Sequence, residues 1–234
     1  MENALVPISR IVILLLSVVI HEISHGLVAH RLGDPTAKLA GRLTMNPLKH
    51  LDFFGSFILP ISLFLLTSGA FIFGWAKPVP YNPLNLKNPR IGERLIAGMG
   101  PASNFLLAGA FSLILLVLPL GEPERNAIAG ATLAPSAVWL ERALATPLMS
   151  FGFFISQIIF INILLGIFNL VPIPPLDGSK VLFSLLPRGA DALRSMLEQY
   201  GLPLLLLFIF FGFGLITPII QALFLLLSGV GSFF

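Results

Sequence analysis

Charged side chains are scarce in this chain of 234 residues. Asp, Glu, Lys and Arg make up 11% of it, whereas a soluble globular domain carries about 25%. Apolar residues make up 56%, and the mean hydropathy is +0.94. So few charges cannot cover a water-facing surface, so the composition excludes a soluble protein and predicts an integral membrane protein.

Cysteine is absent. Its absence excludes disulfide bonds, cysteine-ligated metals and a cysteine nucleophile. Basic residues outnumber acidic ones by 14 to 11, which gives a net charge of +3. Because the basic residues lie mainly between apolar segments, this excess indicates how the chain is oriented in a membrane and does not indicate nucleic-acid binding.

Long apolar runs, by contrast, fill most of the chain. A membrane-spanning helix needs roughly 20 apolar residues, and five segments approach that length: 8–31, 53–76, 94–119, 149–172 and 201–231. We predict an all-α polytopic membrane protein with about 4–6 transmembrane helices, folded as a single domain over 1–234 with its core at 8–187. Pro218 leaves open whether the last segment is one kinked helix or two short ones.

Lys and Arg are concentrated in three of the four connections between these segments. Short loops rich in these residues stay cytoplasmic, which places the connections after 8–31, 53–76 and 149–172 inside. A segment with both ends inside must enter the membrane and return. We therefore predict a re-entrant hairpin at 53–76, where Gly55 and Pro60 allow breaks. The alternative is a simple spanning helix that violates the charge rule.

The first apolar segment contains His21, Glu22 and His25 in the spacing His-Glu-x-x-His. Ionisable side chains at membrane depth cost at least about 2.5–3.5 kcal/mol each, so they are seldom there without a function. On a helix the two histidines share one face and can bind one Zn²⁺, and a glutamate at this position is typical of the general base of zinc hydrolases. The alternative is a proton or ion relay in a transporter.

A catalytic zinc normally takes three protein ligands and keeps one position for water, so a third ligand is required. His30 lies off the face of the other histidines, and His50 lies in a basic loop. Asp177 follows a proline-rich break after segment 149–172, on the same side of the membrane as the end of the first segment. We favour Asp177, although an aspartate in such a place, taken alone, is more often a helix cap.

Two motifs together resemble those of the site-2 proteases, intramembrane zinc metalloproteases that cut transmembrane segments of other proteins. One is the His-Glu-x-x-His sequence in a membrane segment. The other is Asn-x-x-Pro-x-x-x-Leu-Asp-Gly, present here as Asn169 to Gly178. Residues 41–50, 74–80 and 100–104 are also similar to compact bacterial members without PDZ or nucleotide-sensing domains. The resemblance covers about residues 8–187.

The resemblance implies roles for the residues of both motifs. His21, His25 and Asp177 would bind one zinc ion per chain, and Glu22 would activate water. Asn169 would hold the substrate backbone or the developing oxyanion.

Two further asparagines have more general roles. Asn104 would lie behind the metal ligands or serve in packing, and Asn162 would make a hydrogen bond between helices. The family also implies a small strand-like element at 36–46, whose edge could pair with unwound substrate.

The expected function is therefore that of a zinc metalloendopeptidase in the cell membrane, with its active site towards the cytoplasmic side and transmembrane proteins as substrates. A catalytically silent relative that binds transmembrane helices and an ion or proton transporter are the alternatives. The sequence predicts no nucleic-acid partner and gives no oligomeric state.

Overall fold

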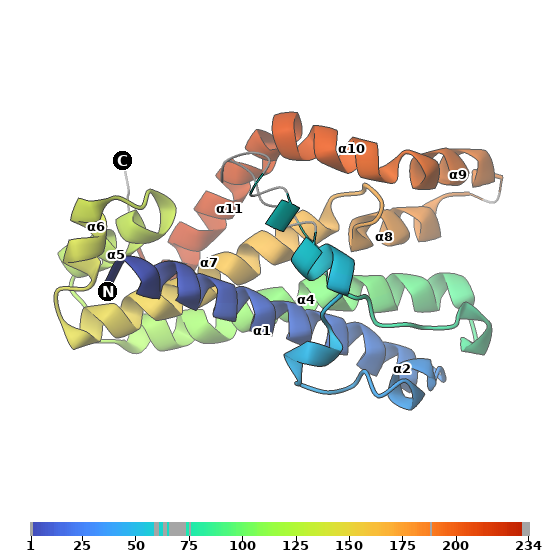
Figure 1. Ribbon diagram of the computed structural model, residues 1–234, viewed down its shortest axis with the longest axis horizontal. Helices are drawn as coiled ribbons and strands as arrows, with labels where there is room; N and C mark the ends of the chain where they lie inside the picture. The colour runs from blue at the N-terminus through green and yellow to red at the C-terminus, as the bar shows by residue number, and fades with distance from the viewer. Residues whose placement is uncertain are drawn as a thin grey trace.

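The computed structural model describes residues 2–58, 61–62, 65, 74, 76–187 and 189–230, and every regular element in these residues is helical (Figure 1). Four helical stretches are long and apolar enough to cross a membrane: Leu5–Arg31, Pro89–Val117, Pro147–Leu170 and Gly201–Ser228. The predicted all-α polytopic fold is confirmed, and four spans agree with the lower end of the predicted range.

Helices α1 (Glu2–Arg31), α4 (Pro89–Val117) and α7 (Pro147–Leu170) form the central bundle, in which α4 packs against both others (Figure 1). Lipid is as apolar as a leucine side chain, so such helices gain stability from close packing around small residues. Gly166 of α7 illustrates this, because a Cβ there would lie 2.8 Å from the ring of Phe105. The bundle therefore has a tightly fitted interior.

The sequence contains start signals for both of the later core helices, α4 and α7. Asn88 and Thr146 are N-caps whose side chains accept hydrogen bonds from backbone N–H groups, and each is followed by a proline, Pro89 or Pro147. Both residue types are favoured at these positions. The chain runs in opposite directions in α4 and α7, so α1 and α7 end at the same end of the bundle (Figure 1).

Shorter helices occupy the two ends of this bundle. At the end where α4 finishes, α5 (Glu122–Leu133) and α6 (Ala137–Ala143) pack on α7. At the opposite end lie α8 (Asp177–Leu185) and α9 (Asp191–Gln199) (Figure 1). The second motif of the sequence, which ends at the start of α8, is thus brought to the end of the bundle where α1 finishes.

The two ends of segment 51–76 meet. The backbone N–H of Lys77 donates to the carbonyl of His50 over 2.8 Å. The segment opens with the π-helix η2 (Phe54–Ile58), while most of 59–75, including the turn of the predicted hairpin, lies outside the described residues. Ends that are hydrogen-bonded to each other cannot lie on opposite sides of a hydrocarbon core about 30 Å thick, so this bond supports re-entry.

The strand-like element expected at 36–46 is a wrong prediction for this structure. Thr36–Leu39 forms the short helix α2, Gly41 turns the chain with φ of +63°, and the 3₁₀-helix η1 (Pro47–Lys49) follows. Asp34 gives the local reason, because its side chain accepts hydrogen bonds from the N–H and hydroxyl of Thr36 and so starts a helical turn. The described part of the chain contains no strand.

The C-terminal segment is one continuous helical stretch. It consists of α10 (Gly201–Leu207), the π-helix η4 (Phe208–Gly212) and α11 (Phe213–Ser228). Figure 1 shows α10 and α11 running in different directions, with η4 at the change. The bend coincides with η4 and not with Pro218, which lies further along inside α11. A π-helical turn is a common cause of a helix kink.

Candidate metal centre

Two histidines of α1 lie close to an aspartate that is 156 residues away from the first of them in sequence. The Nε2 atoms of His21 and His25 are 2.9 Å and 3.0 Å from the same atom, Oδ2 of Asp177. These three residues are only 5%, 8% and 7% exposed. The structure thus brings together the three metal-ligand candidates that the sequence pointed to, inside the bundle.

Asp177 reaches this position because α7 stops before it. Pro172, Pro174 and Pro175 follow the end of α7 and cannot continue its hydrogen bonding, so the chain turns back and restarts as α8 at Asp177. Gly178 makes this turn possible. A Cβ at Gly178 would come within 2.5 Å of the carbonyl oxygen of Val171, so only glycine fits here.

The Nδ1 atoms of both histidines, which face away from Asp177, are hydrogen-bonded to groups of α4. Nδ1 of His25 is 2.7 Å from the carbonyl oxygen of Ile96, which can only accept, so this nitrogen carries the proton. Nδ1 of His21 is 2.6 Å from Oδ1 of Asn104. Both rings are therefore fixed in orientation, as is usual for histidines that bind metals.

The orientation of the Asn104 amide follows from its neighbours. The Nδ2 of Asn162 donates to the backbone carbonyl of Ile158 and to the hydroxyl of Ser17, so its Oδ1 must face Asn104. Asn104 then donates its Nδ2 to Asn162 over 2.9 Å and turns its own oxygen to His21. Nδ1 of His21 therefore carries the proton as well.

These tautomers decide what the site can hold. With Nδ1 protonated, a neutral imidazole presents an unprotonated Nε2, so two nitrogen lone pairs and a carboxylate oxygen face one another. Such an arrangement calls for positive charge between them. Tetrahedral ligands at about 2.0–2.1 Å from Zn²⁺ lie about 3.3 Å apart, close to the separations here, so the donor set fits a zinc ion.

Gly100 of α4 leaves the room for an ion. A Cβ on Gly100 would lie 2.5 Å from the Nε2 atoms of both His21 and His25. Any side chain would therefore fill the position towards which the donor atoms converge. No local signal in the sequence marks this role, because a glycine inside an apolar helix is usually a packing residue.

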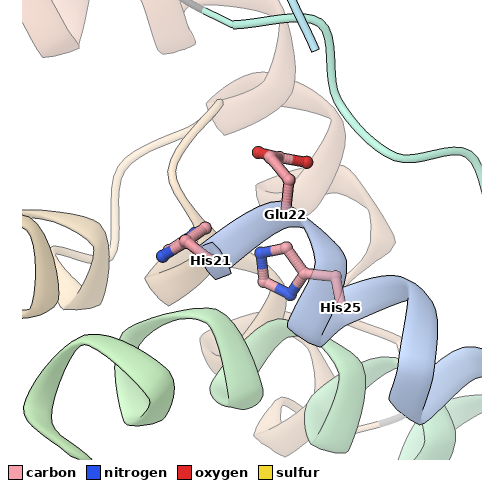
Figure 2. Close-up of side chains that lie close together, drawn as sticks. All are labelled: His21, Glu22 and His25. Atoms are coloured by element: carbon pink, nitrogen blue, oxygen red, sulfur yellow. The ribbon is translucent and has the colours of Figure 1, made fainter. Parts of the chain in front are cut away.

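Glu22 lies beside the histidines on α1 and points to a different side of the helix from His25 (Figure 2). His21, Glu22 and His25 form a group whose ligand atoms lie within 4.8 Å of one another. One carboxylate oxygen of Glu22, Oε2, accepts a hydrogen bond of 2.8 Å from the backbone N–H of Val79. The carboxylate is therefore close to the metal donors and is held by a backbone group.

Lys180 and Tyr81 lie beside the donor set. The Nζ of Lys180 is 3.7 Å from Oδ1 of Asp177 and 5.8 Å from the centre of the Tyr81 ring. Burial, together with the nearby carboxylates of Glu93 and Asp177, raises the pKa of Tyr81 to about 12. The rim of the site therefore offers a cation and a phenol that stays neutral at physiological pH.

The other candidates from the sequence lie elsewhere. Nε2 of His50 bonds the carbonyl of Thr44, and His50 belongs to the loop that holds segment 51–76 closed. His30 is half-buried near the end of α1, and among the described residues it makes no hydrogen bond to His21, His25 or Asp177. Asn169 donates its Nδ2 to the carbonyl of Leu165 in its own helix over 3.0 Å.

Comparison with known proteins agrees with this geometry. The family model described as "Peptidase family M50" matches residues 9–212. "Putative zinc metalloprotease YwhC" of Bacillus subtilis (strain 168) is 37% identical over 193 residues, which cover 82% of this chain and 75% of that protein. "Putative zinc metalloprotease Rip2" of Mycolicibacterium smegmatis (strain ATCC 700084 / mc(2)155) is 28% identical over 227 residues, covering 94% of this chain and 73% of that protein.

No solved structure matches the chain. The family match spans most of the sequence and includes the His21–Glu22–His25 group, two complete candidate spans and parts of the other two. The chain therefore belongs to peptidase family M50, the site-2 protease family of zinc metalloproteases, and is a multi-pass membrane protein.

Proposed function

We propose that this protein is an intramembrane endopeptidase that hydrolyses peptide bonds in or near the transmembrane segments of membrane-protein substrates. The observation that carries this proposal is the position of the donor set, in which His21 and His25 lie on an apolar span and not on an extramembrane loop. A peptide bond must come to such a site through the bilayer or its boundary, which favours membrane-embedded substrates.

In this proposal His21, His25 and Asp177 hold one zinc ion per chain, which when bound polarises the scissile carbonyl and activates water as a nucleophile. Glu22 takes a proton from the attacking water and delivers it to the leaving amine. Because the N–H of Val79 occupies Oε2, the other oxygen of Glu22 remains available for that proton.

The two asparagines have separate proposed roles. Asn104 keeps the Nδ1–H of His21 engaged, so that Nε2 stays available as a ligand. Asn169 is proposed to hold the substrate backbone or the developing oxyanion. Its present hydrogen bond to Leu165 lies within one helix, so a substrate group can replace it without opening the bundle.

The orientation in the membrane is proposed from charge. The connections after α1 and α7 are rich in Lys and Arg, which favours the cytoplasmic side for this end of the bundle and for the active site. We further propose that 1–234 is one functional domain, because the donor set draws on α1 and α8 and is supported by α4 and α7.

The test is proteolysis in proteoliposomes. Purified wild-type protein is mixed with a panel of single-span substrates and compared with Glu22→Gln, with zinc content measured for each sample. Glu198→Gln is the matched control, since Glu198 is exposed and pairs only with Arg194 among the contacts described. We expect cleavage by the wild type and the control, and none by a zinc-loaded Glu22→Gln variant.

Two results would contradict the proposal. Equal cleavage by Glu22→Gln would remove this carboxylate from the chemistry. No cleavage of any substrate in the panel by zinc-loaded wild type would favour a relative that binds transmembrane segments without cutting them.

A further inference from the structure

Two loops meet beside α1 at the end of the bundle that carries the metal donors. The first contains Arg42 and His50, and the second is the extended segment 77–80, here called the strap. The backbone carbonyl of His50 accepts a hydrogen bond of 2.8 Å from the N–H of Lys77. Nη2 of Arg42 donates to the carbonyl of Lys77 over 2.6 Å and to that of Pro78 over 3.3 Å. The first loop therefore holds the backbone of the strap on both its donor and its acceptor side.

The strap passes directly over α1. A Cβ on Gly26 would lie 3.0 Å from a methyl group of Val79 and 2.6 Å from the side chain of Leu43. Gly26 is one residue beyond His25, so both loops are seated against the turn of α1 that carries the motif. The absence of a side chain at Gly26 lets the strap approach closely enough to reach Glu22.

The backbone donors of the strap can be fully accounted for. Pro78 and Pro80 have no N–H, which leaves only those of Lys77 and Val79. The first bonds the carbonyl of His50, and the second bonds Oε2 of Glu22 over 2.8 Å. Both N–H groups of the strap are therefore engaged within the protein, and one of the two is used to hold Glu22.

The burial of Arg42 costs more free energy than a purely structural contact between two loops requires. It is 6% exposed, its Nε has no hydrogen-bond partner, and no carboxylate lies within ion-pair distance of it among the described residues. A buried cation without a carboxylate partner is costly to desolvate. Such a cost is typical of a residue kept for function, and among the described residues the guanidinium donates hydrogen bonds to the two strap carbonyls alone.

We propose that Arg42 is a positioning residue for the general base, acting through the strap. By fixing the carbonyls of Lys77 and Pro78, it sets the place of the next N–H along the chain, that of Val79. That N–H fixes Oε2 of Glu22 and so limits rotation of the carboxylate, leaving Oε1 directed to water. This inference rests on the proposed role of Glu22 as the base.

The test is a double-mutant cycle on cleavage kinetics. Arg42→Met keeps an unbranched apolar stem but removes every donor of the guanidinium, while Val79→Pro removes the N–H that reaches Glu22 together with the valine side chain. Val79→Ala shortens the side chain and keeps the N–H, so it measures the share of the effect that comes from lost side-chain packing and not from the lost donor. We expect each test variant to lower kcat by about 10- to 100-fold with KM and zinc content unchanged, because a small misplacement of a catalytic group costs rates of this order.

If Arg42 acts through the N–H of Val79, the double variant is no slower than Val79→Pro alone. Effects that multiply would overturn the proposal, and so would a loss of kcat in Val79→Ala as large as that in Val79→Pro. A cleavage-inactive wild type would instead mark a failure of the proposed function, so the two failures are distinguishable.

A second readout does not depend on activity or on the folding of the proline variant. Hydrogen–deuterium exchange in the strap reports only the two N–H groups of Lys77 and Val79. We expect Arg42→Met to accelerate exchange at both while leaving α4 protected as in the wild type. Unchanged exchange at Val79 in Arg42→Met would overturn the proposal.

Discussion

Nδ1 of His21 and Oδ1 of Asn104 are 2.6 Å apart, a contact that joins α1 to the middle of α4. Asn104 is fully buried and is itself held by Asn162 from α7. One hydrogen-bonded chain therefore links the three core helices to one side of the candidate metal site. Several measurable consequences follow from the arrangement of groups around that site.

Replacing Asn104 with alanine is expected to weaken zinc binding by about 10- to 100-fold, because the ring of His21 loses the acceptor that fixes its tautomer. The measurement is zinc affinity by competition with a chelator, on protein shown to be folded. Unaltered affinity would mean that the packing of α1 alone orients His21.

Gly100→Ala is expected to abolish zinc binding while the helical content stays near that of the wild type. The new Cβ would occupy the space in front of both Nε2 atoms. Gly98→Ala is the matched control on the same helix, since a Cβ there meets nothing within 4 Å. Zinc content by mass spectrometry decides the matter, and full occupancy in Gly100→Ala would place the ion elsewhere.

Asn169→Ala is expected to lower kcat by about 10²- to 10³-fold with zinc content unchanged, as happens when a donor to a developing oxyanion is removed. The side-chain hydrogen bond of Asn169 to the carbonyl of Leu165 lies within α7, so the stability of the protein should change little when it is lost. The check is steady-state kinetics beside thermal unfolding in detergent. A kcat equal to that of the wild type would leave Asn169 with a packing role only.

Asp34→Ala is expected to destabilise the protein by about 1–3 kcal/mol, because the carboxylate ties the end of α1 to the loop around residues 82–85. It accepts hydrogen bonds from Thr36, from the N–H of Asn82 and from the side chain of Asn85. The measurement is the free energy of unfolding in detergent, and an unchanged value would show that other contacts hold this loop.

The same carboxylate predicts a pH dependence. Burial acts to raise the pKa of Asp34, but the hydrogen bonds from Thr36, Asn85 and Asn82 outweigh it and hold the pKa below its ordinary value. A lowered pKa in the folded state means that this contribution to stability is present above about pH 3.9 and is lost as the pH falls through the folded-state pKa. Thermal unfolding followed from neutral to acidic pH in wild type and Asp34→Ala checks this, since the gap between them should narrow only at the acidic end.

Much of this arrangement was accessible from the sequence. The spacing of His21, Glu22 and His25 in an apolar segment indicated the candidate site, and the proline-rich break before Asp177 indicated where a third ligand would come from. Charge in the loops predicted that segment 53–76 returns to the side it entered, which the bond between His50 and Lys77 supports. These signals work because they depend on local periodicity and on side-chain charge.

Other features have no such signal. Gly100 matters only because another helix lies opposite it, and Val79 acts through a backbone N–H that every residue except proline possesses. The expected strand at 36–46 was wrong because a side-chain hydrogen bond from Asp34 favours a helical turn there. Contacts between distant segments decide all three, and composition or period cannot reveal them.

The bond between His50 and Lys77 also has a bearing on how this protein tolerates change. Because the residues that flank segment 51–76 are hydrogen-bonded to each other, a change in the length of the segment that keeps this bond is expected to leave the following helices on the same side of the membrane. Substitutions that break the hydrogen bond between His50 and Lys77 are instead expected to displace Val79, and with it the carboxylate of Glu22.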